Sequence, residues 1–149
     1  MKRLMIIILL ACTYSMCHAQ EELFKKYSST KGVESIYISK TLLRLMPKSA
    51  MGDKDISRIA GKLDHIRILD CEKKELIPAI KKDAENFYKK KAYELVMETA
   101  EDDEQVYIYL RKLKNKQNEF VILNLEKDEI QIISIVGDIT LEDIESLQM

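Results

Sequence analysis

The sequence predicts one α+β domain, with a mostly antiparallel sheet and helices packed on it. A chain of 149 residues has the length of one domain. Its C-terminal third has four strand-like segments with short connections, which require antiparallel neighbours and predict a four-stranded meander. The middle of the chain has apolar residues at helical spacing. Helices with an apolar stripe are therefore expected to cover at least one face of this sheet.

The first 19 residues have the pattern of a secretory signal peptide. A basic start precedes a short apolar run from Leu4 to Ala11, which is shorter than the roughly 20 residues that span a bilayer. The residues before Gln20 resemble a cleavage site with Ala19 in its last position. We therefore expect a signal peptide over residues 1–19, a mature domain over residues 20–149, and a periplasmic or secreted protein of the cell envelope.

A second processing route stays open at Cys12. The run Leu9-Leu10-Ala11-Cys12 resembles a lipobox, in which the cysteine is lipidated and becomes the first residue. This route would give an outer-membrane-anchored lipoprotein, and it is the one case in which we expect a membrane as a partner. The sequence favours cleavage before Gln20, because a small residue is more usual at the position of Leu10.

The first part of the mature chain predicts a helix, a strand and a second helix. Apolar residues can share one side of residues 21–27, and they alternate with polar ones from Val33 to Ser39. Ser39 can then cap a helix, and Pro47 is expected to end it.

The next part predicts two more helices around a second strand. Asp53 can cap a helix with apolar residues three and four positions apart up to Leu63. The short apolar run over residues 65–69 predicts a strand, and the longest apolar stripe predicts a helix that begins near Ile77. We expect the two strands to join the same sheet through a right-handed crossover.

The four C-terminal strands are expected over residues 93–99, 105–113, 119–125 and 129–136. The last two strands are apolar on both faces, which predicts central positions in the sheet with cover on both sides. Thr140 and Asp143 then resemble a capping box that opens a short terminal helix.

Four stretches of this sequence resemble a known family. They are VESIYISKTLLRLMP (Val33 to Pro47), HIRIL (His65 to Leu69), the Lys-rich long helix, and the hairpins that end near Val136-Gly137-Asp138. Together they resemble the Bacteroidetes family catalogued as domain of unknown function 4252, over essentially the whole mature chain. The resemblance implies a small exported envelope protein of a Gram-negative bacterium, and it supplies no catalytic residues.

Composition argues against several classes of chemistry. Removing residues 1–19 takes away two basic residues and no acidic one, so the formal net charge falls from −1 to −3, which argues against nucleic acid as a partner. The mature chain has one His and one Cys, too few for a zinc site. The acidic run from Glu101 to Glu104 does not match a calcium loop, and the scattered glycines do not form a phosphate loop. We expect no metal and no cofactor.

Two functions remain for the mature chain. Tyr107, Tyr109 and Arg111 alternate along one expected strand face, and Tyr and Arg are enriched where proteins bind partners. These three residues predict a binding surface of a non-enzymatic binding or accessory module, for an envelope protein or a small ligand. The alternative is a small thiol-dependent or hydrolytic enzyme centred on Cys71, with His65 as its base. The sequence favours the binding module and assigns no catalytic residue.

Overall fold

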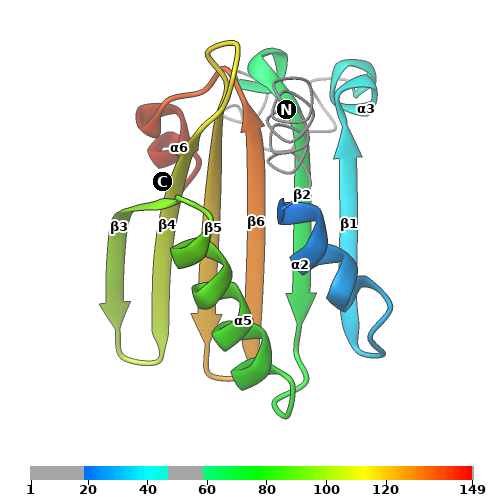
Figure 1. Cartoon of the computed structure of the whole chain (residues 1–149), viewed down its shortest axis with the longest axis vertical. Coiled ribbons are helices and arrows are strands. Elements are labelled where there is room, and N and C mark those ends of the chain that lie inside the picture. Colours follow the sequence, from blue (N-terminus) through cyan, green and yellow to red (C-terminus); the bar gives the residue numbers. More distant parts are fainter. Residues whose placement is uncertain (1–18, 47–58, 149) are drawn as a thin grey trace, which may run out of the picture.

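The structure is a computed structural model that describes residues 19–46 and 59–148, and it contains one α+β domain (Figure 1). Six strands form an antiparallel sheet with the order β1-β2-β6-β5-β4-β3. The elements are α2 (Ala19–Ser28), β1 (Val33–Ser39), α3 (Lys40–Leu45), the 3₁₀ turn η2 (Ala60–Lys62), β2 (Leu63–Cys71), α5 (Ile77–Lys90), β3 (Glu94–Glu101), β4 (Glu104–Lys112), β5 (Asn118–Glu126), β6 (Glu129–Gly137) and α6 (Leu141–Gln148).

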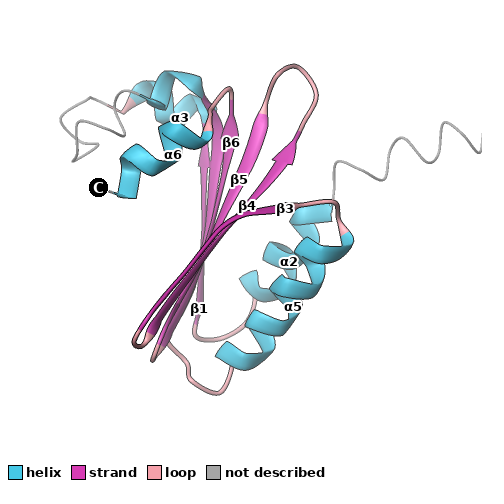
Figure 2. Ribbon diagram, turned by 90° about the vertical axis from the view of Figure 1, so that its left-hand side faces the viewer, coloured by secondary structure: helices cyan, strands magenta, loops and turns pink. Residues whose placement is uncertain are grey.

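The described helices pack on opposite faces of the sheet and toward opposite ends of it. Figure 2 shows α2 and α5 against one face, while α3 and α6 lie on the other face at the far end of the strands. The two faces carry separate cores: Ile132 and Tyr88 belong to the core beneath α2 and α5, and Ile122 and Phe120 belong to the other core. Each face is therefore covered by described helices over part of its length.

The C-terminal meander is confirmed, with β5 and β6 at the centre of the sheet. Of the three helix caps that the sequence predicts, those at Ser39 and at Thr140–Asp143 are present, and Asp53 lies outside the described residues. The Ser39 hydroxyl accepts a hydrogen bond from the backbone N–H of Leu42 at 3.3 Å. Thr140 and Asp143 exchange bonds of 3.0 and 3.3 Å between side chain and backbone N–H, which stabilises the start of α6.

The expected crossover between the first two strands is wrong. β1 and β2 are direct antiparallel neighbours, with Val33 opposite Cys71 and Ser39 opposite His65. Antiparallel neighbours need a return connection at the same end of the sheet, whereas a handed crossover joins parallel strands. The connection that carries α3 is such a return.

The second strand begins earlier than the sequence predicts. β2 starts at Leu63 because Leu63 already pairs with Gly137, with a register shift before His65. Most of the helix expected from Asp53 lies outside the described residues, as do Pro47 and residues 1–18. No helix in the described part of the chain is long and apolar enough to cross a membrane.

Candidate functional site

The tyrosine row on β4 faces α5. Tyr109 is only 7% exposed, and its ring stacks on Tyr88 of α5 with the centroids 4.9 Å apart. Tyr107 is half-buried against the same core. The sequence correctly places these two side chains on one face, but that face lies beneath a helix. A contact surface needs exposed side chains, and Tyr109 is buried. The structure therefore does not favour this row as the binding site.

Arg111, the third residue of that row, belongs to a buried polar network. Its Nε and Nη2 atoms lie 3.1 and 3.0 Å from Oε2 of Glu119, a residue that is 1% exposed. The Tyr93 hydroxyl donates to the same oxygen at 2.9 Å, and the Ser134 hydroxyl donates to Oε1 at 2.9 Å. Burial and the nearby Glu119 carboxylate raise the pKa of Tyr93. Both carboxylate oxygens of Glu119 accept hydrogen bonds, so the network joins β4, β5 and β6 through Arg111, Glu119 and Ser134.

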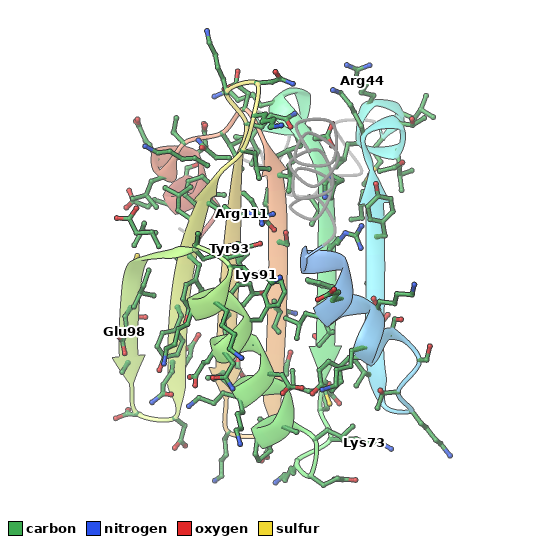
Figure 3. The ribbon with its side chains drawn as sticks, viewed as in Figure 1. Arg44, Lys73, Lys91, Tyr93, Glu98 and Arg111 are labelled. Atoms are coloured by element: carbon green, nitrogen blue, oxygen red, sulfur yellow. The ribbon has the colours of Figure 1, made fainter. Side chains whose placement is uncertain are left out.

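Figure 3 shows Tyr93 and Arg111 beside the C-terminal end of α5. The guanidinium lies 4.8 Å from the centroid of the Tyr93 ring, a cation–π distance. Sequence reasoning missed Glu119. The available signal was a single carboxylate at the start of an apolar strand, directly after the polar run over residues 114–118.

Cys71 and His65 do not form a catalytic pair. Both lie on β2, six residues apart, which separates them by about 20 Å at the rise of a strand. A nucleophile and its base must lie within hydrogen-bond reach. Cys71 is also 1% exposed. The expectation that His65 serves as the base of Cys71 is therefore wrong.

The acidic run from Glu101 to Glu104 forms the turn between β3 and β4, and its side chains are exposed. Within residues 19–46 and 59–148, no three His, Cys, Asp or Glu side chains are placed to hold a metal ion.

A groove of about 670 Å³ lies on the sheet face that carries α3 and α6. Figure 2 shows that α3 and α6 lie at one end of this face. The strand register brings one apolar residue from every strand into a single row across the sheet: Ile36, Ile68, Ile133, Ile122, Ile108 and Met97. Ile36 is 39% exposed, and Ile68 and Ile133 are half-buried. An aliphatic surface of this kind, open to solvent, is typical of a binding site.

The two ends of the groove differ in chemistry. Near α3 and η2 its walls are apolar, with Leu43, Met46, Ile59 and Leu63. Toward the β3–β4 and β5–β6 turns the lining becomes polar, through Thr99, Glu104, Asn124 and Gln131. The groove therefore has an aliphatic inner end and a polar outer end.

Asn124 has unused hydrogen-bonding capacity in this polar end. Its Nδ2 donates to Glu126 at 3.5 Å, a long bond, and its buried Oδ1 has no partner in the described part of the protein. Beside it, Gln131 donates to Asp70 at 2.9 Å. A buried acceptor without a donor is uncommon in folded proteins, so the described residues leave the hydrogen bonding of Asn124 incomplete at this end of the groove.

The comparisons with known proteins identify the family. The model of the family described as "Domain of unknown function (DUF4252)" matches residues 27–147. The chain belongs to this family, as the resemblance of its strands and long helix implies. Neither the curated proteins nor the solved structures contain a match to this chain. The groove must therefore be interpreted from its own chemistry.

Proposed function

We propose that this chain is an exported, non-enzymatic binding protein that holds a ligand with an aliphatic chain in the groove of the sheet. The observation that carries the proposal is the groove itself. Its volume of about 670 Å³ lies within the range of small-molecule sites, which are mostly apolar with a few polar groups that orient the ligand. The competing version of this proposal is that the bound partner is an envelope protein.

The shape of the lining favours a chain-like ligand. The isoleucines come from β1, β2, β5 and β6, so they form a continuous strip and not an isolated pocket. Branched aliphatic side chains offer dispersion and the hydrophobic effect but little orientation. Orientation would come from the polar end, where Asn124 and Gln131 lie.

The proposal of export depends on the N-terminal sequence. The basic start, the short apolar run and Ala19 support cleavage before Gln20, which would place the protein in the periplasm or outside the cell. Lipidation at Cys12 would instead anchor it to the outer membrane.

The test is titration calorimetry of residues 20–149 with hexanol, octanol and decanol. Each methylene group that enters the groove contributes about 0.8 kcal/mol, so affinity should rise about fourfold per methylene. Ile68→Gln, which makes the floor of the groove polar, should weaken decanol binding. The matched control is Leu95→Gln, at a residue that is 46% exposed and outside the groove lining. Absence of binding by all three alcohols would contradict the proposal.

A further inference from the structure

We propose that the ligand of this groove is a single-chain amphiphile with a cationic head group that carries N–H donors, such as a primary ammonium. This inference rests on the proposed function of the groove and specifies the chemistry of its ligand. The chain would run along the strand direction and cross the isoleucine row, with its end near α3 and η2. The head would lie at the polar end, near the β3–β4 and β5–β6 turns.

Carboxylates crowd the polar end. Side chains alternate along a strand, so the acidic residues an even number of positions from the groove residues lie on the groove face. They come from all six strands: Glu34, Asp70, Glu101, Glu104, Glu126 and Glu129. Glu104 lines the groove itself, and Glu126 accepts the bond from Asn124. The neighbouring carboxylate of Asp70, with burial, raises the pKa of Glu129, which is the expected effect of crowded like charges.

Among the described residues, basic side chains near this end are fewer than the carboxylates. Lys127 lies exposed in the β5–β6 turn, and Lys74 forms an ion pair with Asp128 at 2.6 Å. Lys73 lies against Gly32, before β1. A negative potential therefore extends over the open end of an apolar groove, where the low dielectric of the floor strengthens its attraction for a cation.

Asn124 supplies the second argument. Its Oδ1 is a buried acceptor without a donor among the described residues, and the residue lines the polar end. An ammonium N–H would satisfy it, whereas a carboxylate or sulfate head would bring another acceptor to a site that is already acidic. A trimethylammonium head has the charge but no N–H donor. Its affinity therefore distinguishes attraction by the carboxylates from hydrogen bonding to Asn124.

The size of the groove favours a small amphiphile over a basic peptide helix. One turn of helix with its side chains, about 10 Å wide and 5.4 Å long, occupies roughly 420 Å³. The groove of about 670 Å³ would hold fewer than two such turns. A cationic peptide that binds when no alkyl compound does would overturn the inference and indicate a protein partner.

The experiment is a calorimetric titration of residues 20–149 at pH 7 and low salt, below the micelle concentration of each probe. The probes share a ten-carbon chain: decylammonium, decyltrimethylammonium, decanol and decanoate. We expect decylammonium to bind at least tenfold more tightly than decanoate, with decyltrimethylammonium between them. Raising the salt concentration should reduce this preference.

Glu104→Gln should lower the preference for decylammonium over decanoate. The control is Glu142→Gln, which removes the same charge from an exposed residue of α6, at the other end of the sheet. Equal affinities for decylammonium, decanol and decanoate would overturn the cationic head and leave the proposed function standing. Equal affinities for the two ammonium probes would overturn the role of Asn124. Failure of all four probes would refute the proposed function itself.

Discussion

Replacing Glu119 by Leu tests whether the buried network stabilises the sheet. The Glu119 carboxylate is 1% exposed and accepts bonds from Arg111, Tyr93 and Ser134. Without it, the Arg111 side chain, 18% exposed, keeps its charge in a site with little water. Breaking a buried ion pair by removing one partner costs about 3–5 kcal/mol. We expect Glu119→Leu to lower the free energy of unfolding by about this amount.

A second variant distinguishes the effect of an unpaired, buried Arg111 charge from a simple loss of packing. In Glu119→Leu with Arg111→Met, the unpaired guanidinium is gone, and an apolar pair often replaces a buried ion pair without loss. The double variant should therefore be more stable than Glu119→Leu alone. Its Tyr93 and Ser134 hydroxyls have still lost the carboxylate as an acceptor, so it should stay below the unchanged protein.

Urea denaturation of residues 20–149, followed by circular dichroism, measures both effects. The control is Glu85→Gln, which breaks a partly exposed pair with Lys81 on α5 and should cost less than about 0.5 kcal/mol. A loss below about 1 kcal/mol in Glu119→Leu, or a further loss when Arg111→Met is added, would refute the reasoning.

Three further predictions concern the core, a helix cap and export. Ile132→Ala and Ile122→Ala remove buried side chains from the two central strands, 0% and 9% exposed, so each should cost about 2–5 kcal/mol in urea denaturation; losses below about 0.5 kcal/mol for both would contradict the packing. The backbone N–H of Thr140 holds the pKa of Asp143 below its ordinary value of 3.8. The charged form therefore stabilises the fold above that value, and this contribution is lost as pH falls through the lower folded pKa. Asp143→Asn should be less stable at pH 7, with a difference that narrows below about pH 4; a constant difference would exclude this linkage. Mass spectrometry of the protein from its native host should show Gln20 at the N-terminus, whereas a lipid-modified cysteine peptide would indicate lipoprotein processing.

Local sequence was enough to predict most elements of this domain. Alternation from Val33 to Ser39 predicted β1 with its observed bounds, and the Thr140–Asp143 pair predicted the start of α6. Strands apolar on both faces predicted that β5 and β6 are central. These features depend on residues a few positions apart, or on the period of two that every strand imposes.

The pairing of β1 with β2 and the position of the candidate site depended on long-range packing. Alternation shows that Tyr107 and Tyr109 share a face, but it cannot show that α5 covers that face. It likewise places Ile68 and Ile122 on the other face without showing that the described helices there leave a groove. The sequence by itself determined which side chains lie together on each strand face. Only the tertiary structure decided which face is covered, because a helix can reach either side of the sheet and its place follows from contacts between residues far apart in the chain.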